Sequence, residues 1–356
     1  MTRVGLIARA DNTGLGVQTW EFHRHMRPTK TLVVAPASRA GRAEHPIFPA
    51  RFPGATIVRG IPNTQHLEDF LDGVDVVFTA ETPYNYTLFS LAAEVGVRTV
   101  LQYNFEFLDY LQRRDLPRPD VLADPARWHR NEVETHRPDL RVVTLPVPIA
   151  LDRFTRRFEP APSARRFLHI VGRPAVHDRN GTADLLAALT HVRSQITVTI
   201  RCQDPLYLPK LLPRYRIPDH VHVDVASGDL ENYWDAYSGH DVLVMPRRFG
   251  GLCLPAQEAL GAGMPVIMPD IAPNELLCDR AWLVPATRTG EFRARSMIDL
   301  HTVDHRALAA RIDEFASNTN VFATAREAAR WRGQQRSWEA LSSDYDRVFD
   351  GLLAPA

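Results

Sequence analysis

The stretch Pro246–Val266, "PRRFGGLCLPAQEALGAGMPV", indicates a ligand-binding turn between a strand and a helix. It follows the apolar run "DVLVM", and it contains Gly250 and Gly251, whose backbones can adopt conformations that other residues avoid. Pro255 suits the first turn of the helix that follows. Free backbone N–H groups and the positive end of that helix would then lie at the end of a strand, where an anion such as a diphosphate binds favourably.

Glu258 falls within the first turn of this expected helix. A carboxylate at that place can accept two hydrogen bonds from a vicinal diol such as a ribose. The alternative is that Glu258 only complements the helix dipole and that the glycines only turn the chain. The candidate donor-binding residues of the turn are Gly250, Gly251, Leu252, Cys253 and Leu254.

Short apolar runs alternate with helical patterns on both sides of this stretch, which predicts doubly wound parallel sheets. The first four runs are "RVGLIAR", "TLVVAP", "VDVVFTA" and "RTVLQY", and the alternation restarts at "FLHIVG" after the segment "FTRRFEPAPSARR". We predict a first domain over residues 1–153, a linker over 154–166 and a second domain over 167–335. Ligands of such open sheets bind at the carboxyl ends of the strands.

Composition narrows the class of protein. The 356 residues carry 42 basic and 42 acidic side chains, which argues against binding nucleic acid mainly through phosphates. Three cysteines without C-x-x-C spacing indicate neither a disulfide framework nor a zinc site. Neither a signal-peptide pattern nor a run of about 18 apolar residues occurs, so we expect a cytoplasmic protein without a transmembrane segment.

A second candidate anion site is "IVGRPAVHDRNG", where a strand ends and Gly172 opens a turn. Arg173 and Arg179 precede the next helix, which is expected to begin near Gly181. Their guanidinium groups could stabilise the charge on a departing phosphate without a metal. The alternative is that both are surface arginines on a loop.

A third candidate lies in "ARADNTGLGVQTW", where Gly14 and Gly16 lead from the first strand into the first helix. The spacing lacks the full G-x-G-x-x-G pattern, so it predicts a donor contact only weakly. The alternative is tight-turn packing.

Residues 168–285 resemble the C-terminal domain of retaining GT-B glycosyltransferases related to bacterial glycosyltransferase family four. That family shows Pro-Ser-x-x-Glu-Gly-Phe-Gly-Leu-Pro-x-x-Glu-Ala and then Gly-x-Pro-Val. This sequence keeps Leu254, Pro255, Glu258, Ala259, Gly263, Pro265 and Val266. The segment "VGRPAVHDRNG" is similar to the family's phosphate-binding segment, with Arg179 in place of a lysine.

The resemblance implies a GT-B fold of two Rossmann-like domains with a cleft between them. It implies a transferase that moves a sugar from a UDP- or GDP-linked donor to an acceptor hydroxyl, with retention and without metal or other cofactor. Glu258 would hold the ribose, and Arg173 and Arg179 would stabilise the leaving group. Because "SWE" at 337–339 is similar to the start of the family's last helix, residues 336–356 are expected to pack back on the first domain.

The resemblance also points to acceptor-binding residues in the first domain. The family often has a histidine after the fourth strand, where this sequence has "TAETPYNY". The candidates there are Glu81, Thr82, Tyr84 and Asn85. Glu81 would be a general base or would cap the following helix, and Glu106 in "QYNFEFLDY" would line an acceptor pocket or belong to the core.

One departure from the family pattern bears on activity. The first glutamate of its E-x7-E pair falls on Gly250, so the donor sugar or the catalytic competence is in question. The neighbouring Arg247 and Arg248 could serve a differently charged donor or acceptor. Two rival functions stay open: a GT-B nucleotide-sugar epimerase and a noncatalytic sugar-nucleotide binder. The acceptor could be a glycan, a small molecule, a protein or a hydroxymethylated DNA base, and the sequence does not give the oligomeric state.

No metal site is expected. Asp344 and Asp346 match a spacing found in metal-binding glycosyltransferases, but they lie in an amphipathic helical pattern. Residues two apart on a helix point away from each other, so the two carboxylates would not share an ion.

Overall fold

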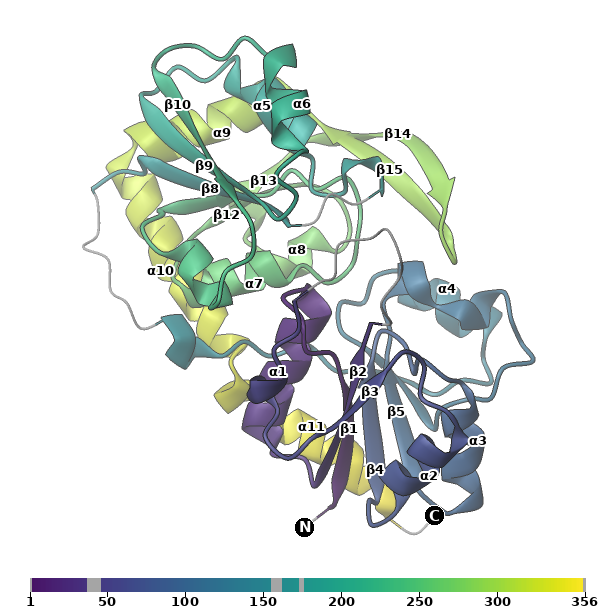
Figure 1. The fold of residues 1–356 in the computed structure, drawn as a ribbon. Helices are drawn as coiled ribbons and strands as arrows, with labels where there is room; N and C mark the ends of the chain where they lie inside the picture. The colour runs from purple at the N-terminus through teal and green to yellow at the C-terminus, as the bar shows by residue number, and fades with distance from the viewer. Residues whose placement is uncertain (1, 37–45, 155–161, 173–175, 355–356) are drawn as a thin grey trace. The chain divides into compact units, whose positions relative to one another are not determined.

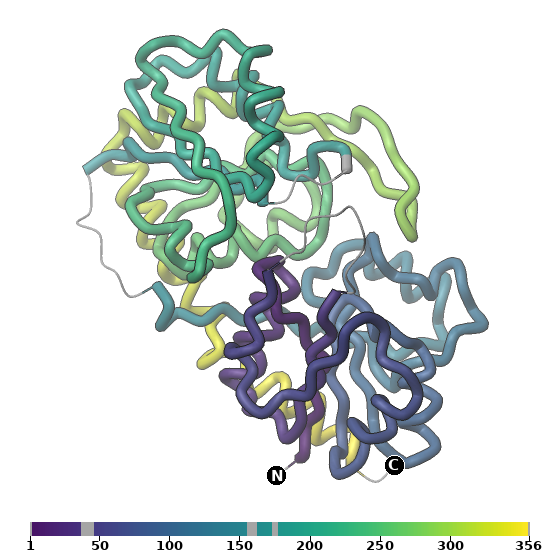
Figure 2. Tube along the Cα trace, viewed as in Figure 1, coloured from purple at the N-terminus to yellow at the C-terminus, as the bar shows by residue number. Residues whose placement is uncertain are grey.

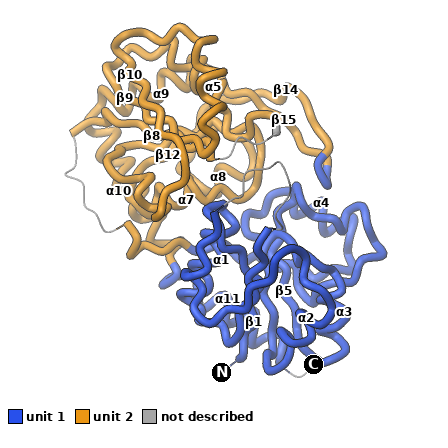
Figure 3. Tube along the Cα trace, viewed as in Figure 1, with its two compact units in different colours: residues 1–148, 294–296, 338–356 blue, residues 149–293, 297–337 orange. Residues whose placement is uncertain are grey.

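The computed structural model describes residues 2–36, 46–154, 162–172 and 176–354 (Figure 1). The chain forms two compact units (Figure 3). Unit 1 consists of residues 1–148, 294–296 and 338–356, and unit 2 consists of residues 149–293 and 297–337. The first boundary lies five residues before the predicted end of the first domain, at residue 153.

Unit 1 contains a seven-stranded parallel sheet with the strand order β3-β2-β1-β4-β5-β6-β7. Its strands are β1 (Val4–Ala8), β2 (Lys30–Ala35), β3 (Thr56–Arg59), β4 (Val76–Ala80), β5 (Arg98–Gln102), β6 (Val121–Asp124) and β7 (Val142–Thr144). The central strands β1 and β4 are buried along their whole length, as expected for apolar strands covered on both faces. The strand order reverses between them, which places a topological switch point at their carboxyl ends.

Helices cover both faces of this sheet (Figure 1). They are α1 (Gly14–Met26), α2 (Thr64–Leu71), α3 (Thr87–Glu94), α4 (Arg130–His136) and α11 (Trp338–Leu353). Helices α2 and α3 pack on one face, and α1 and α11 on the other. Phe22 of α1 stacks on Phe78 of β4 at 4.6 Å and meets Trp338 edge-on at 6.0 Å. The last helix of the chain therefore belongs to the core of unit 1.

Unit 2 contains a six-stranded parallel sheet with the order β10-β9-β8-β11-β12-β13. Its strands are β8 (Arg166–Gly172), β9 (Ile196–Cys202), β10 (Val221–Ser227), β11 (Val242–Val244), β12 (Val266–Pro269) and β13 (Leu283–Val284). Its helices are α5 (Thr182–Leu189), α6 (Leu208–Leu211), α7 (Leu254–Gly261), α8 (Asn274–Leu277), α9 (His305–Ser317) and α10 (Thr319–Gln335). Two doubly wound parallel sheets were predicted, and both are confirmed.

Unit 2 also carries an antiparallel hairpin that the sequence did not predict, β14 (Ala286–Arg293) and β15 (Met297–Val303) (Figure 2). Strand β14 is mostly polar, whereas β15 alternates the buried Ile298 and Leu300 with polar residues, a strand pattern that the prediction missed. Arg288 forms ion pairs with Glu291 and Asp299. Cross-strand pairing and the burial of apolar side chains such as Ile298 and Val303 together hold this hairpin in place.

Candidate functional site

Two of the predicted anion-binding segments meet at the carboxyl edge of the unit 2 sheet. They follow β8 and β11, which are adjacent parallel strands. Gly181 has a φ of 70°, and a Cβ atom there would lie 1.9 Å from the carbonyl oxygen of Pro246. The backbone N–H of Arg248 donates to the carbonyl of Arg179 over 2.8 Å. Only glycine at position 181 allows the two loops to approach this closely.

Gly250 lies where this loop turns, with a φ of 121°. A Cβ atom at this position would come within 2.8 Å of Arg179 Nη2 and within 3.2 Å of Arg247 Nη2. Arg247 is 3% exposed, and its Nη2 donates to the carbonyl of Gly251 over 2.9 Å. Two guanidinium groups therefore border the turn where the resembling family has a glutamate, and a glutamate side chain has no room there in this arrangement.

The loops after β8 and β11 contain three further arginines, Arg173, Arg179 and Arg248. Arg248 is held by backbone carbonyls, since its Nε donates to His301 and its Nη1 to His177, each over 3.1 Å. Arg179 lies with its Cζ 5.4 Å from the ring centre of Phe249. Arg173 falls outside the described residues. Of the two arginines predicted to stabilise a leaving group, the structure thus locates Arg179, beside the Gly250 turn.

Helix α7 presents its N-terminus to the same turn. It begins at Leu254, and no side chain of the described residues caps it at Cys253. Helix α5 differs, because both oxygens of Asp178 accept from its first N–H groups, those of Thr182 at 3.0 Å and Ala183 at 2.8 Å. Of these two helices, α5 has a carboxylate cap and α7 has none in the described structure. The partial positive charge at the N-terminus of α7 is therefore available to an anion.

Glu258 lies one turn further along α7 than the sequence predicted. It is the fifth residue of the helix, so the expectation that it belongs to the first turn is wrong. Its side chain is 7% exposed, and Oε2 accepts a hydrogen bond from the hydroxyl of Tyr237. Burial, together with the negative charge of Glu258, raises the pKa of Tyr237 well above its usual value. Tyr237 therefore stays protonated and holds Glu258 in place.

The remaining predicted contacts of this turn are backbone positions. Gly250, Gly251 and Cys253 are buried, and Leu252 is partly exposed. Tyr237, which fixes Glu258, was not among the predicted residues. It lies 21 positions earlier in the chain, and no spacing pattern connects the two.

His169 is a second residue that the sequence analysis missed. It is fully buried on β8, with Nδ1 2.8 Å from the carbonyl oxygen of Val244 and Nε2 3.0 Å from Thr182 Oγ1. Burial lowers the pKa of His169, so the ring is neutral at pH 7. It connects β8, β11 and the start of α5 beneath the site, which makes it a positioning residue.

In unit 1, the glycines of the first loop have a packing role. The side chain of Thr13 caps α1 by accepting from Gly16 N over 3.2 Å. A Cβ atom at Gly16 would lie 2.0 Å from the carbonyl oxygen of Asp11. Asp11 is fully buried, and Arg9 Nε donates to its Oδ2 over 2.6 Å. Close packing thus accounts for Gly16, and a donor contact at Gly14 or Gly16 stays a prediction.

Glu81 follows β4 in a left-handed backbone conformation, with a φ of 66°. Its Oε2 accepts from Asn104 Nδ2 over 3.2 Å. Helix α3 begins six residues later, and it is Asn85 whose Oδ1 accepts the N–H of Thr87 at 3.0 Å. Glu81 therefore lies at the switch point of the sheet and does not cap α3.

The other predicted acceptor residues lie in the same loop or near it. Thr82 Oγ1 accepts from the N–H of Tyr84 over 3.1 Å, and Asn85 Nδ2 donates to the carbonyl of Pro62 over 3.0 Å. Burial raises the pKa of Tyr84. Glu106 follows β5 and is 3% exposed.

Strained backbone conformations gather near the carboxyl ends of three strands. Six of the seven non-glycine residues with positive φ in the described chain follow β4, β6 or β8: Glu81, Tyr84, Arg127, His129, His177 and Asp178. Each such conformation costs roughly 1–3 kcal/mol and persists where the surrounding structure imposes it, often at functional sites. These conformations therefore favour the carboxyl edges of both sheets as functional sites. No local sequence pattern predicts where such conformations occur.

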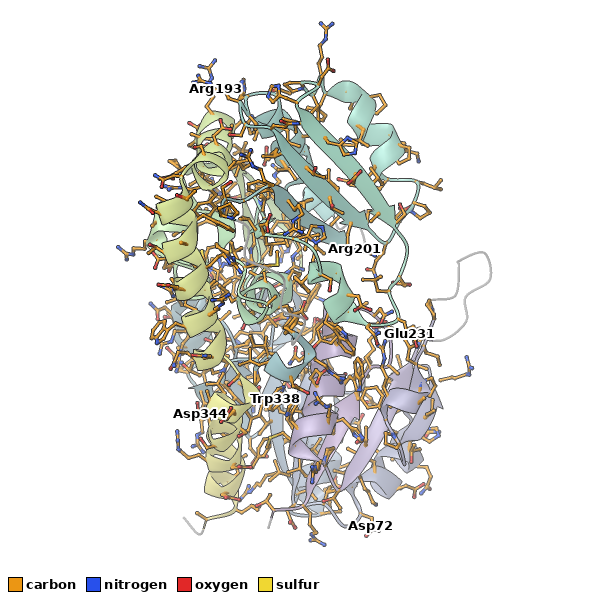
Figure 4. The ribbon with its side chains drawn as sticks, turned by 90° about the vertical axis from the view of Figure 1, so that its left-hand side faces the viewer. Asp72, Arg193, Arg201, Glu231, Trp338 and Asp344 are labelled. Carbon is orange, nitrogen blue, oxygen red and sulfur yellow. The ribbon has the colours of Figure 1, made fainter. Side chains whose placement is uncertain are left out.

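Within the described ranges, no three or more His, Cys, Asp or Glu side chains are grouped so as to hold a metal ion. Figure 4 shows Trp338 at the start of α11 and Asp344 further along the same helix. Asp344 pairs with Arg347 at 3.0 Å, while the intervening Tyr345 is buried in unit 1.

None of the described helices combines the length and the apolar character that crossing a bilayer requires.

Comparisons with known proteins agree with this architecture. Residues 165–302 match the family model described as "Glycosyl transferases group 1". No match was found among curated proteins. Solved structures with similar folds include a sucrose-phosphate synthase from Thermosynechococcus elongatus, with 15% identity, a TM-score of 0.69 and 100% of both chains covered.

Two further similar structures come from other bacteria. A glycosyltransferase from Rickettsia africae has 11% identity and a TM-score of 0.68, over 100% of this chain and 99% of that one. The Anabaena protein HepE, solved in complex with UDP and glucose, has 11% identity and a TM-score of 0.68, over 99% of this chain and 100% of that one. At these identities the likeness shows the fold. The family match in unit 2 and the two parallel sheets together support a glycosyltransferase of the GT-B fold.

Proposed function

We propose that this protein transfers a sugar from a nucleotide-sugar donor to an acceptor hydroxyl, with retention of configuration and without a metal. The observation that carries the proposal is that the N-terminus of α7, the Gly250 turn and Arg179 meet within unit 2, with the Tyr237–Glu258 pair further along the same helix. A cation at a helix start, with a fixed carboxylate further along that helix, suits a nucleoside diphosphate.

Each part of the donor has a proposed partner. Backbone N–H groups between Gly250 and Leu254 would bind the diphosphate, and Arg179 would offset the charge that develops on the leaving phosphate. Glu258 would accept hydrogen bonds from the ribose hydroxyls. Arg173 is proposed to share this role. A UDP- or GDP-linked sugar is the proposed donor, and the likeness to HepE, solved with UDP, supports the first of these.

Unit 1 is proposed to bind the acceptor. Glu81 would accept the proton of the attacking hydroxyl, and Thr82, Tyr84, Asn85 and Glu106 would contact the acceptor. A glycan or a small molecule is the proposed acceptor, because equal numbers of basic and acidic residues favour neither a DNA nor any other polyanionic acceptor. A protein or a hydroxymethylated DNA base remains an alternative.

The donor site is tested by thermal shift and calorimetry with UDP, GDP, ADP and TDP and their sugars. One nucleotide should stabilise the wild-type protein in proportion to its affinity, and Glu258→Ala should lose this gain. Glu327→Ala, at an exposed position on α10, is the control and should keep it. If none of the nucleotides binds, the donor site and the transferase assignment both fail.

The reaction class is tested with the nucleotide sugar that binds. A transferase should release the nucleoside diphosphate faster when a pool of acceptors is added, and the product should carry the sugar. An epimerase would convert the donor into an isomer with no acceptor present. A noncatalytic binder, which the glycine at position 250 makes a rival, would bind the donor and leave it unchanged with every acceptor.

A further inference from the structure

Unit 2 contains a cavity of about 190 Å³ at the edge of the sheet opposite the Gly250 turn. Ala262 and Met264, which line it, lie between the end of α7 and the start of β12, and His240 precedes β11. These are the amino ends of two paired parallel strands, whereas the turn with Gly250 follows a carboxyl end. The cavity is therefore a different place from the proposed donor site.

The walls of the cavity come from three segments of unit 2. The 3-10 helix Leu151–Phe154 supplies Arg153 and Phe154, and the segment around the 3-10 helix Tyr233–Tyr237 supplies most of the rest. The polar and aromatic lining residues are Arg153, Asn232, Trp234, Asp235, Ser238 and His240. Phe154 stands edge-on to Tyr237 with ring centres 5.6 Å apart, which fixes two of these walls against each other.

The chemistry of the lining combines an aromatic face with hydrogen-bonding groups. Trp234 is partly exposed, and the Arg153 guanidinium lies over its ring at 4.4 Å. Asn232 Nδ2 donates to Asp235 Oδ2 over 3.2 Å, so amide and carboxylate are held together. Ser238 adds a hydroxyl that can donate and accept.

His240 lines the cavity, and its ring also interacts with the backbone of Tyr237. Its Nδ1 is buried and has no hydrogen-bond partner among the described residues. A buried ring nitrogen left in this state costs free energy unless a ligand or an ordered water pairs with it. A ligand with a hydroxyl group could supply that partner.

We propose that this cavity binds a single neutral monosaccharide ring, at a site separate from the donor site. The apolar face of a pyranose would pack on the face of the Trp234 ring opposite Arg153, and its hydroxyls would bond to carboxylate, amide, hydroxyl and imidazole groups. The volume is smaller than the 300–1,000 Å³ or so that drug-sized ligands occupy, so it suits one ring and not a nucleotide. Mostly polar walls also disfavour an apolar ligand.

The two sites share one residue without merging. Tyr237 lines the cavity, and its hydroxyl donates to Glu258. The experiment must therefore distinguish binding in the cavity from binding of a sugar in the donor site. Saturating nucleotide blocks the donor site and leaves the cavity open.

Calorimetry and tryptophan fluorescence on the full chain test the proposal, with glucose, galactose, mannose and N-acetylglucosamine, each with and without saturating UDP or GDP. At least one sugar should bind in the presence of nucleotide. Trp234→Ala should weaken this binding by on the order of tenfold or more. Trp331→Ala is the matched control, because Trp331 is 59% exposed on α10 and should not affect binding.

A second variant distinguishes loss of binding from loss of folding. Ala262→Leu adds bulk to the cavity and removes no contact, so it should abolish sugar binding while circular dichroism and melting stay close to wild type. Four results would overturn the proposal: no binding of any sugar at tens of millimolar, binding that survives both variants, competition by nucleotide, or binding of inorganic phosphate in place of neutral sugars. If no nucleotide binds but a sugar still binds through Trp234, the proposed function fails and this inference stands.

Discussion

Gly250 lies so close to Arg179 that a Cβ atom at position 250 would come within 2.8 Å of the arginine Nη2. The two residues are 71 positions apart and come from loops after neighbouring strands. The guanidinium fills the space that a side chain at 250 would need. The glycine and the arginine therefore depend on each other, and replacing either one should disturb the proposed diphosphate site.

Gly250→Ala should destabilise the protein and weaken nucleotide binding. The left-handed conformation costs a residue with a side chain roughly 1–3 kcal/mol, and the new methyl group would displace Arg179. Denaturant unfolding and calorimetry with the binding nucleotide measure the two effects. Gly351→Ala is the control, because a Cβ atom there meets nothing within 4 Å. A Gly250→Ala protein with wild-type stability and affinity would contradict the close packing.

Tyr237→Phe should weaken nucleotide binding by on the order of tenfold, because a hydrogen bond to a charged group contributes about 1.5–3 kcal/mol. The ring remains, so the loss would come from the hydroxyl that donates to Glu258. Calorimetry measures the affinity, and Tyr215→Phe serves as the control within unit 2. Equal affinities of wild type and Tyr237→Phe would show that Glu258 needs no such support.

Arg179→Gln should reduce affinity for the nucleoside diphosphate more than for the monophosphate, because the guanidinium is proposed to lie beside the diphosphate. The affinity of the variant should also depend less on salt concentration than that of the wild type. Arg193→Gln is the control, at an exposed position in unit 2 between the end of α5 and the start of β9 (Figure 4). Equal losses for both nucleotides would place Arg179 away from the terminal phosphate.

Stability should fall with acidification because of His169. Burial lowers its pKa in the folded protein below the ordinary value of 6.5. Below about pH 6.5 the unfolded chain takes up a proton at His169 that the folded state does not. The contribution of the neutral ring to the free energy of unfolding is therefore complete above that pH and is lost as the pH falls. His169→Gln should flatten the dependence of melting temperature on pH between about 5 and 7. His191→Gln, at an exposed position, should leave the dependence unchanged.

Glu81→Gln should lower the rate of sugar transfer while nucleotide affinity stays the same, because the residue is proposed to take the proton of the acceptor hydroxyl. The expected loss is on the order of a hundredfold in kcat. Steady-state kinetics measures it, with Glu94→Gln, an exposed residue of α3, as the control. A raised acceptor KM with unchanged kcat would instead make Glu81 a binding residue.

Much of the fold followed from local patterns in the sequence. Runs such as "VGLIA" and "VVFTA" are almost entirely apolar because strands covered on both faces bury every side chain, and both are central strands of the sheet. Glycines and Pro255 marked the turn and the start of α7. The hairpin β14–β15 was missed because β14 is mostly polar and the apolar alternation of β15 is short.

The sequence by itself determined that two parallel sheets form and that the segment 246–266 lies at a strand end, because hydrophobic periodicity and turn residues act over a few neighbouring positions. Only the tertiary structure decided that Arg179 borders Gly250 and that Tyr237 donates to Glu258. These residues lie on separate elements, so their contacts depend on how strands order and helices pack. That information is spread over the whole core and is not contained in any one stretch of sequence.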